Sequence, residues 1–433
     1  MVQLYWVMIL KKRVSILLTI FIIVGITFLG YKYFNYKKEL KEIEAKEKLA
    51  QKLKLDREKL KKSVEEHYNK YVKTTKETKL YINSDNSYIE YGMIGSNVEI
   101  ELNNVDITYK TEYFPINGMD CYVYYKDVEK IEELSKKSNS YKKYVPFNEN
   151  VITNEHTSLY DDNGLVYKIN KGVNLPIIIK DSDKYYVEFN NKLLYINKED
   201  SSTVKNKNTT AQIRNNIRTL TYHFIYKKGD YCVDPSVCTL YETFDSQMKY
   251  LSDNDYFTMT MEDLELFLDG KIQIPKKSIV ITLDDGAFVK NAVEIVEKNK
   301  VNATMFIITS IYDVSNIKSE YMNFQSHTDN LHNNYKCKGG NQGGQLLCEK
   351  ESVILEDLKT SQKKLGGSFA LAYPFFDFNE RAIKILKQAG FRLAFVGQYD
   401  TNGYSTQKTN KMKIRRKTMY GTINMTTFVN YLT

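Results

Sequence analysis

The first hydrophobic pattern in this chain is a long apolar run close to its N-terminus. Residues 14–30 (VSILLTIFIIVGITFLG) are uncharged and follow Lys11, Lys12 and Arg13. With the apolar residues before those charges, the run can cross a bilayer, which takes about 20 helical residues. We therefore expect residues 1–36 to form a cytoplasmic tail and an uncleaved transmembrane signal anchor. A cleavable signal peptide is the alternative, although no small-x-small cleavage site precedes the next charged region.

A charged segment follows, with a narrow apolar seam. Residues 37–79 contain neither glycine nor proline, and apolar positions recur at Leu53, Leu60, Val64 and Tyr71. This spacing is typical of a helix with one narrow apolar face. The segment is predicted to be a helical stalk that holds the following domains away from the membrane, and a short coiled coil is the alternative.

The pattern then changes to short runs rich in tyrosine, valine and isoleucine, broken by Asn, Asp and Gly. The runs repeat: residues 111–127 (TEYFPINGMDCYVYYKD) align with residues 183–200 (DKYYVEFNNKLLYINKED). Two small β-rich units are therefore predicted, at residues 80–140 and 141–200. Their pattern resembles that of tandem bacterial SH3-like modules.

Residues 201–216 (SSTVKNKNTTAQIRNN) have the composition of a polar linker. In residues 217–433, strand-like runs such as SIVITL, ATMFII and FRLAFVG alternate with amphipathic stretches such as AFVKNAVEIVEKNK and NERAIKILKQAG. Regular alternation of strands and helices indicates a parallel sheet of the α/β class. About seven such strands predict a deformed (β/α) barrel, whose functional side chains lie at the C-terminal strand ends.

The charge composition argues against a nucleic-acid partner. The formal net charge is +9, from 62 Lys and Arg against 53 Asp and Glu. Much of the lysine excess alternates with glutamate, and no long basic block occurs. No feature of the sequence fixes an oligomeric state.

Four cysteines fall into two local pairs, Cys232 with Cys238 and Cys337 with Cys348. Such pairs are typical of disulfides formed in an oxidising compartment. Four unpaired thiols or a four-cysteine zinc site remain as alternatives. The disulfide interpretation favours an extracytoplasmic body on a single-pass membrane anchor.

Several polar residues follow predicted strands of the barrel: Asp284 and Asp285 end SIVITL, His327 ends YMNFQS, and His223 ends TLTY. His332 follows His327 by five residues, a spacing that suits neither one helix face nor one strand face. A strand end followed by a turn can bring both imidazoles together. A helix cap accounts for one aspartate but not for two, so one carboxylate and two imidazoles indicate a catalytic metal site. Unrelated polar loop residues are the alternative.

The segments TLDDG, SHTDNLH and AYP, in this order, resemble the first three motifs of the polysaccharide deacetylases, the NodB-homology domain of carbohydrate esterase family 4. The resemblance implies that Asp285, His327 and His332 bind a divalent metal, usually Zn²⁺, with Co²⁺, Ni²⁺ or Mn²⁺ as alternatives. It implies that Asp284 is the general base for the attacking water. It also implies that Tyr373 lends its backbone N–H to the oxyanion.

The general acid of most family members is a histidine of a C-terminal motif, and no histidine follows His332 here. The chain instead resembles the permuted, biofilm-type poly-N-acetylglucosamine deacetylases, which carry a Tyr-His motif before DDG. This resemblance assigns the role of general acid to His223 in LTYHFI. A catalytically inactive protein is the alternative.

Two further departures concern the neighbours of the expected base and the substrate groove. The arginine that precedes Tyr-Pro in many family members is absent, so Arg415 or Arg416 is a candidate to steady the base. Phe376 replaces a common glycine after the YPF segment. Pro374, Asp377, Arg415 and Arg416 are candidate groove residues, and a turn or cap role for Asp377 is equally open.

Together these observations predict a metal-dependent deacetylase that removes acetyl groups from N-acetylglucosamine residues of a cell-wall glycan, with peptidoglycan favoured. The alternatives are an exopolysaccharide (poly-N-acetylglucosamine) deacetylase and an inactive wall-binding protein. The expected partners are an acetylated envelope polymer and the membrane.

Overall fold

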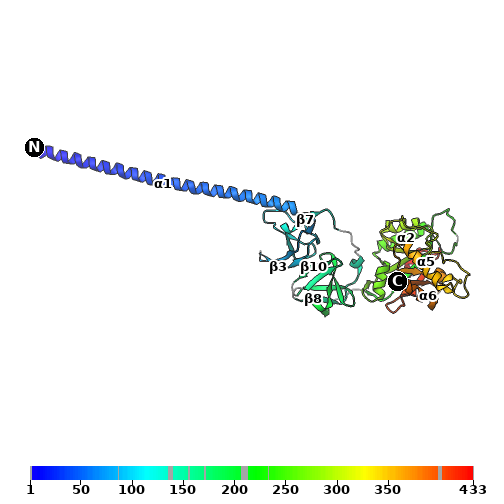
Figure 1. Cartoon of the computed structure of the whole chain (residues 1–433). Coiled ribbons are helices and arrows are strands. Elements are labelled where there is room, and N and C mark those ends of the chain that lie inside the picture. Colours follow the sequence, from blue (N-terminus) through cyan, green and yellow to red (C-terminus); the bar gives the residue numbers. More distant parts are fainter. Residues whose placement is uncertain are drawn as a thin grey trace. The chain divides into compact units, whose positions relative to one another are not determined.

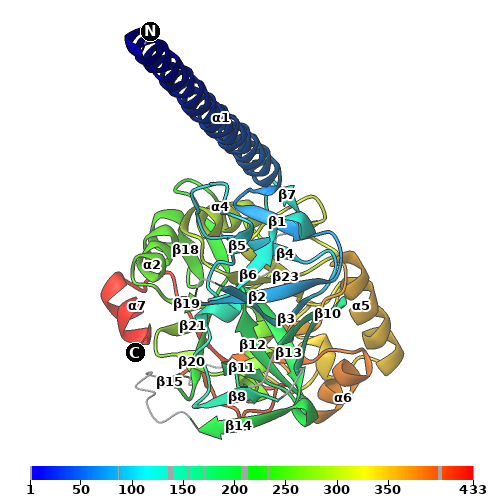
Figure 2. The same ribbon diagram turned by 90° about the vertical axis from the view of Figure 1, so that its left-hand side faces the viewer.

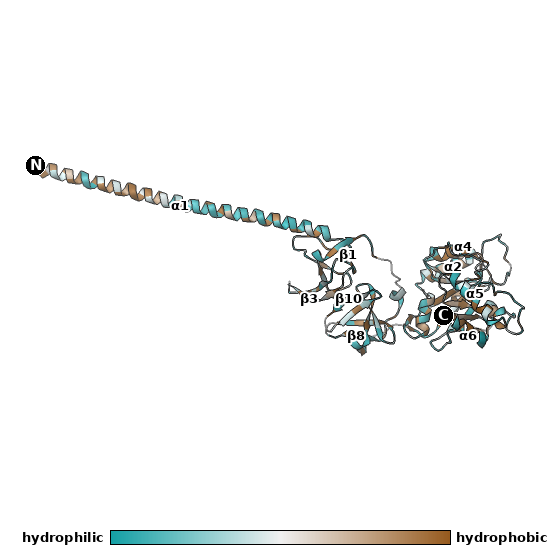
Figure 3. Cartoon of the chain, in the orientation of Figure 1, coloured by the Kyte–Doolittle hydropathy of each residue, from teal (hydrophilic) through white to brown (hydrophobic). Residues whose placement is uncertain are grey.

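In a computed structural model of the chain, the N-terminal apolar run lies in one long helix, α1 (Val2–His67) (Figure 1). The helix is apolar in its N-terminal part and hydrophilic beyond it (Figure 3). Its length and composition allow it to cross a membrane. The residues that the structure describes are 2–85, 87–134, 140–154, 157–169, 172–205, 213–232, 234–397 and 402–432.

Helix α1 ends twelve residues before the predicted stalk boundary at residue 79. Strand β1 (Tyr71–Thr74) already lies within that segment. Val72 is fully buried there, and β1 pairs with strands on both sides. Lys70 donates its backbone N–H to the Asn69 side chain, so the chain turns directly after the helix. Burial of Val72 in a sheet thus overrides the helical spacing read from Leu53 to Tyr71.

The chain divides into two compact units, residues 1–134 and 135–433. Beyond α1, the first unit is an antiparallel β structure. Strand β1 pairs with β4 and β7, β2 pairs with β3 and β6, and β5 pairs with β6. The remaining strands are β2 (Thr78–Ser84), β3 (Ser87–Ile94), β4 (Glu99–Glu101), β5 (Tyr113–Pro115), β6 (Tyr122–Tyr124) and β7 (Val128–Ile131).

The second unit begins with seven strands that repeat this pairing order. Strand β8 pairs with β11 and β14, β9 pairs with β10 and β13, and β12 pairs with β13. These strands are β8 (Glu149–Thr153), β9 (Thr157–Asp161), β10 (Gly164–Ile169), β11 (Asn174–Lys180), β12 (Lys184–Phe189), β13 (Lys192–Asn197) and β14 (Ser201–Lys205). The internal repeat of the sequence therefore has a counterpart in strand topology.

The strand sets are displaced from the predicted repeat boundaries. The first set begins at Tyr71 instead of 80, and the last strand of the second set, β14, occupies the start of the predicted linker. Strand β14 is built of polar residues at the edge of the sheet, where only one side is paired, so its sequence resembles a linker. Residues 206–212 of that linker lie outside the described residues.

A barrel of parallel strands occupies the C-terminal part of the second unit. The strand order is β21-β22-β23-β24-β25-β27-β16, and β16 pairs with β21 to close the ring. The predicted (β/α) barrel of about seven strands is confirmed. The barrel strands are β16 (Ile217–Tyr222), β21 (Ser278–Leu283), β22 (Ala303–Ile307), β23 (Met322–Ser326), β24 (Ala370–Ala372), β25 (Leu393–Gly397) and β27 (Ile414–Thr418).

Helices cover the barrel in two groups, α2 with α4 and α7, and α5 with α6 (Figure 2). The helices are α2 (Tyr241–Asp253), α3 (Met261–Leu268), α4 (Val289–Asn299), α5 (Glu351–Lys364), α6 (Glu380–Gln388) and α7 (Met425–Leu432). Short strands are β15 (Ile213–Arg214), β17 (Phe224–Tyr226), β18 (Cys238–Leu240), β19 (Phe257–Thr258), β20 (Ile274–Pro275) and β26 (Tyr404–Ser405). The 3₁₀ helices are η1 (Tyr125–Asp127), η2 (Ser140–Lys143), η3 (Lys198–Asp200), η4 (Gln345–Leu347) and η5 (Pro374–Phe376).

The barrel strands β21, β22, β24 and β25 are buried on both faces, which explains their largely apolar sequences. All six residues of β21 (SIVITL) are buried, as expected of a parallel strand between a packed interior and covering helices. At the C-terminal ends of these strands, the first polar residues mark the open end of the barrel. Those residues form the candidate site.

Candidate active site

Five of the predicted site residues follow the C-terminal ends of barrel strands and line one cavity of about 280 Å³: His223, Asp284, Asp285, His327 and His332. Asp284 follows β21, His327 follows β23 and His223 follows β16. The parallel direction of the strands brings these ends together, although the residues are far apart in sequence. The cavity is lined by His223, Phe224, Asp234, Ser236, Val237, Asp284, Asp285, His327, His332, Asn341, Gln342, Phe375, Phe376, Thr418 and Tyr420.

Asp285, His327 and His332 converge as the sequence predicts. The Nε2 atoms of His327 and His332 each lie 3.4 Å from Oδ1 of Asp285. One ligand atom from each residue lies within 4.8 Å of the others. A carboxylate and two imidazoles at this separation fit the donor set of a catalytic transition-metal site, which keeps positions open for water and substrate.

Hydrogen bonding and burial prepare the two imidazoles for that role. His327 Nδ1 lies 2.9 Å from the Ala372 carbonyl oxygen and donates to it, so Nε2 is the nitrogen that faces Asp285. Nε2 donates to the carboxylate when the ring is protonated and offers a lone pair to a metal when the ring is neutral. Burial and the neighbouring His327 lower the pKa of His332 to about 4, so this imidazole is neutral at pH 7. Metal ligation requires neutral imidazoles.

The electrostatics around Asp285 favour a positive charge in the cavity. Burial disfavours ionisation of Asp285, but its hydrogen bond to His327 and the nearby imidazoles outweigh burial and hold its pKa below the usual range. Conversely, burial of His327 is outweighed by Asp284 and Asp285, which raise the pKa of His327. The carboxylates thus stabilise a cation at this position, whether a proton or a metal ion.

Asp284 is held by Arg416. Arg416 Nη1 donates to Asp284 Oδ1 at 2.6 Å, and Nη2 donates to Oδ2 at 2.8 Å. Both side chains are buried inside the barrel. Burial favours the neutral carboxyl, but Arg416 and the nearby imidazoles outweigh it and place the pKa of Asp284 below its ordinary value. Of the two candidate arginines, Arg416 contacts the expected base.

Arg415, the other candidate, does not reach Asp284. Its side chain is exposed, and it lines a separate surface hollow with Tyr404 and Lys413. The reason is the alternation of side chains along β27, where Arg416 points into the barrel and its neighbour points outward. The sequence alone left the choice open because the facing of β27 was unknown.

His223 lines the same cavity as the Asp-His-His group. It also contributes to lowering the pKa of both Asp284 and Asp285, so its ring lies within electrostatic reach of the two carboxylates. The Nδ1 atom of His223 is buried and has no hydrogen-bond partner among the described residues.

The backbone N–H of Tyr373 is not available to the oxyanion, contrary to expectation. Its backbone N–H donates to the Phe395 carbonyl at 3.1 Å, and its buried hydroxyl donates to the Met412 carbonyl at 3.2 Å. Strand pairing with β25 therefore uses the N–H that the resemblance assigned to the oxyanion. Tyr373 is also absent from the cavity lining, whereas Phe375 lines it and packs against His332 with ring centroids 4.5 Å apart.

Neither Pro374 nor Asp377 lines the described cavity, although both were candidate groove residues. Asp377 is 1 % exposed. Its carboxylate accepts backbone N–H groups from Gln342 at 3.0 Å and Gly344 at 2.7 Å, as well as a short bond from Asn341. Asp377 therefore anchors a loop that forms the cavity wall.

Both predicted disulfides are present, Cys232–Cys238 and Cys337–Cys348. Each closes a loop that lines the cavity. The first loop contributes Asp234, Ser236 and Val237, and the second contributes Asn341 and Gln342. In the second loop, a Cβ atom at Gly343 would lie 2.4 Å from a backbone oxygen, so close backbone packing accounts for that glycine.

The wall residues Asp234, Ser236 and Val237 and the aromatic pair Phe375 and Phe376 were not predicted. Both phenylalanines adopt positive φ angles, 58° and 62°, a conformation that is unusual for bulky residues and tends to occur at functional sites. The replacement of the usual glycine by Phe376 was the available signal. No feature of the sequence pointed to Asp234, Ser236 or Tyr420.

Comparison with known proteins agrees with this geometry. Residues 271–394 match the Polysaccharide deacetylase family. A poly-β-1,6-N-acetyl-D-glucosamine N-deacetylase from Staphylococcus aureus is 30 % identical over 174 residues, which are 35 % of this chain and 58 % of that protein. The enzyme of the same name from Staphylococcus epidermidis is 28 % identical over 179 residues, 36 % of this chain and 60 % of that protein. The chain thus spans less than two thirds of these relatives.

Solved structures of similar proteins include the deacetylase PplD from Streptococcus pyogenes in complex with acetate. It is 20 % identical with a TM-score of 0.41, covering 50 % of this chain and 98 % of that one. A polysaccharide deacetylase from Bacillus cereus is 18 % identical with a TM-score of 0.41, covering 77 % of this chain and 99 % of that one. The family match assigns residues 271–394 to a polysaccharide deacetylase domain.

Proposed function

We propose that this protein hydrolyses the N-acetyl groups of a polymeric N-acetylglucosamine glycan, leaving free amines and releasing acetate. The observation that carries the proposal is the convergence of Asp285, His327 and His332 beside the Arg416-bound Asp284 in one cavity. This arrangement provides a cation site and a buried carboxylate base together, as hydrolysis of an amide requires.

Asp285, His327 and His332 are the residues that would hold a divalent metal, and we propose Zn²⁺. When bound there, the metal polarises the acetyl carbonyl and makes water a stronger nucleophile at neutral pH. Asp285 supplies a negative charge, and the two Nε2 atoms supply lone pairs.

We assign the proton transfers to Asp284 and His223. Asp284 accepts a proton from the attacking water, and the two hydrogen bonds from Arg416 fix the direction of its carboxylate. As the oxygen bonds to the acetyl carbon and the C–N bond breaks, the leaving nitrogen needs a proton. His223 is the imidazole of this cavity outside the cation group, and we propose that it donates that proton.

We propose Phe375, in place of Tyr373, as the oxyanion donor. The Tyr373 N–H is committed to Phe395, and Pro374 has no N–H to offer. Phe375 is the next residue with a backbone N–H, and it lies in the cavity wall beside His332. An N–H aimed at the developing negative charge lowers the barrier.

The names of the staphylococcal relatives favour poly-β-1,6-N-acetylglucosamine as the polymer. The β repeats and the stalk made peptidoglycan the favoured substrate on sequence grounds. Because the sequence match lies with the poly-N-acetylglucosamine enzymes, we propose that polymer first and peptidoglycan second. The apolar part of α1 would anchor the protein, with the disulfide-bearing body outside the cytoplasm.

The full-length chain in detergent, supplied with either polymer, tests the proposal by acetate release. We expect release from poly-β-1,6-N-acetylglucosamine that stops with a chelator and returns with Zn²⁺ or Co²⁺. Release from peptidoglycan, without release from poly-β-1,6-N-acetylglucosamine, would make peptidoglycan the proposed substrate. No release from either polymer by the metal-loaded protein would favour the inactive, glycan-binding alternative.

A further inference from the structure

The turn between His327 and His332 adopts a conformation that its own sequence does not favour. Thr328, a β-branched residue, has a φ of 72°, in a region where such side chains are genuine outliers. Thr328 is fully buried, and its backbone N–H donates to Ser326 Oγ at 3.1 Å. A residue persists in this region only where the surrounding structure holds it there.

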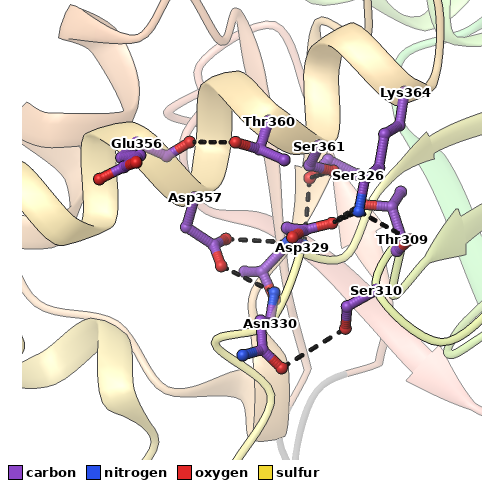
Figure 4. A network of polar contacts seen from close by, with 11 residues as sticks. Thr309, Ser310, Ser326, Asp329, Asn330, Glu356, Asp357, Thr360, Ser361 and Lys364 are labelled. Carbon is purple, nitrogen blue, oxygen red and sulfur yellow. Dashed lines mark hydrogen bonds and ion pairs between the residues drawn. The ribbon is translucent and has the colours of Figure 1, made fainter.

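One support of this turn is Asp357 of helix α5 (Figure 4). One carboxylate oxygen of Asp357 accepts the Asp329 backbone N–H at 2.8 Å, and the other accepts the Asn330 backbone N–H at 2.7 Å. Asp357 is 9 % exposed, so these bonds form largely away from water. Hydrogen bonds to an ionised acceptor are among the stronger ones in proteins.

Two further residues on the same face of α5 contact the turn or the last residue of β23, directly before it. Ser361, four residues after Asp357, lies with its Oγ 2.8 Å from Ser326 Oγ. Lys364, seven residues after Asp357, donates to Asp329 Oδ1 at 2.6 Å. Positions i, i+4 and i+7 share one helix face. We call Asp357, Ser361 and Lys364 the α5 clamp.

The clamp acts on the segment between the two histidines and on Ser326 just before it, and none of its hydrogen bonds goes to an imidazole. Its bonds fix the backbone of Asp329 and Asn330, in the middle of the turn. His327 is fixed separately by β23 and by the Ala372 carbonyl. The position of His332 relative to His327 therefore depends on the path of the backbone between them.

We propose that Asp357 is a positioning residue for the metal site, which sets the path of the 328–331 turn so that His332 reaches the cation held by Asp285 and His327. The inference rests on the proposed function only in that the Asp-His-His group binds a metal. It does not depend on the glycan. Supporting residues of this kind typically change metal affinity about 10- to 100-fold when they are altered.

The test compares Asp357→Asn with Glu356→Gln in the full-length protein. Each change removes one negative charge from α5, but Glu356 is exposed and Figure 4 shows no hydrogen bond or ion pair from its side chain to the turn. Asp357→Asn places an amide NH₂ opposite a backbone N–H. We expect Zn²⁺ affinity, measured by competition with a chromophoric chelator, to fall about 10- to 100-fold in Asp357→Asn. Glu356→Gln should remain within about twofold of wild type, since it lies outside the supporting shell.

Amide hydrogen exchange in the metal-free protein gives a second readout. The Asp329 and Asn330 amides should exchange faster in Asp357→Asn, while amides of β23 keep their protection. Wild-type metal affinity in a folded Asp357→Asn protein would overturn the proposal and leave Asp357 a purely structural role. If Asp357→Asn does not fold, Lys364→Met decides, because the Lys364 side chain is 46 % exposed and holds the same turn through Asp329. Unchanged affinity in that variant would also overturn the proposal.

These outcomes separate the inference from the proposed function. A wild-type protein that binds no Zn²⁺ would defeat the metal site itself. A protein that binds Zn²⁺ but releases no acetate from either polymer would defeat the proposed activity, while the comparison of metal affinities would still decide the role of Asp357.

Discussion

Arg416 donates two parallel hydrogen bonds to Asp284 inside the barrel, at 2.6 and 2.8 Å, with both side chains removed from solvent. The guanidinium comes from β27 and the carboxylate from the end of β21, 132 residues earlier. A buried charge pair of this geometry fixes the orientation of the carboxylate more firmly than a single contact could. Orientation matters here because the proposed base must face the water that attacks the substrate.

Replacing Arg416 by lysine should therefore impair catalysis more than folding or metal binding. Lysine keeps the positive charge but replaces the planar fork by a single point charge. Misplacement of a catalytic group by about 1 Å can cost about 100-fold in rate, so we expect kcat for acetate release to fall by about that factor in Arg416→Lys. Zn²⁺ content, measured by elemental analysis, should remain one equivalent per chain.

Arg415→Lys is the matched control, because Arg415 is the next residue on the same strand and its side chain is exposed. This variant should keep wild-type turnover. Equal losses in the two variants would show that the strand as a whole is sensitive, and full activity in Arg416→Lys would remove Arg416 from the proposed mechanism.

The metal content of two variants should distinguish the roles of the adjacent residues Asp284 and Asp285. Asp284→Asn removes the proposed base, so acetate release should fall by about 10²- to 10⁴-fold, the usual contribution of general acid–base catalysis. Asp285→Asn removes a proposed ligand, so it should lose the metal and the activity together. Metal analysis of both purified variants checks the assignment, and loss of metal from Asp284→Asn with retention by Asp285→Asn would reverse the roles.

Much of this site could be predicted because strand ends are visible in the sequence. Asp284, Asp285, His223 and His327 each follow an apolar run, and parallel strands bring such ends to one side of a barrel. His332 could be added because a five-residue spacing suits only a strand end followed by a turn. Local chemistry and one topological rule were sufficient for these positions.

The remaining residues depended on information that no local pattern carries. Arg416 was preferred over Arg415 only when the facing of β27 was known, and a shift of one residue in register would have exchanged them. The Tyr373 N–H was assigned to the oxyanion because its pairing with Phe395 could not be foreseen. Similarly, Asp377 resembled a groove or turn residue because its loop partners lie more than thirty residues away.

Leaving-group chemistry provides a test of His223. Amide hydrolysis needs a proton for the departing nitrogen, whereas an aryl acetate releases a phenolate that needs little assistance. We therefore expect His223→Gln to lose about 10²- to 10⁴-fold in acetate release from the glycan and to hydrolyse p-nitrophenyl acetate nearly as well as wild type. Zn²⁺ content should be unchanged.

The same pair of substrates separates His223 from Asp284. Asp284→Asn should lose activity toward both substrates, because the attacking water needs the base in each case. Unimpaired glycan deacetylation by His223→Gln would exclude His223 as the acid. A parallel loss on both substrates would instead suit a role in water attack or substrate binding.

Asp377 should affect substrate binding through the wall of the cavity. Its buried carboxylate accepts three backbone N–H groups of the Cys337–Cys348 loop, which carries Asn341 and Gln342 into the cavity lining. In Asp377→Asn, one acceptor oxygen becomes a donor facing those N–H groups, at a cost to the free energy of unfolding of about 1–3 kcal/mol. We expect KM for the polymer to rise several-fold (on the order of 1 kcal/mol of binding free energy). Zn²⁺ affinity should stay at the wild-type value, because Asp377 bonds to the loop and not to any of the three proposed metal ligands.

Asp313→Asn is a suitable control, since Asp313 is exposed and accepts the backbone N–H of Ser315, two residues away on its own loop. Steady-state kinetics on the polymer and thermal unfolding of the same samples separate the two effects. A lower stability with an unchanged KM would mean that the loop contributes to folding without contacting substrate. A higher KM that reduction of the Cys337–Cys348 disulfide reproduces in the wild type would place the loop in the glycan-binding wall.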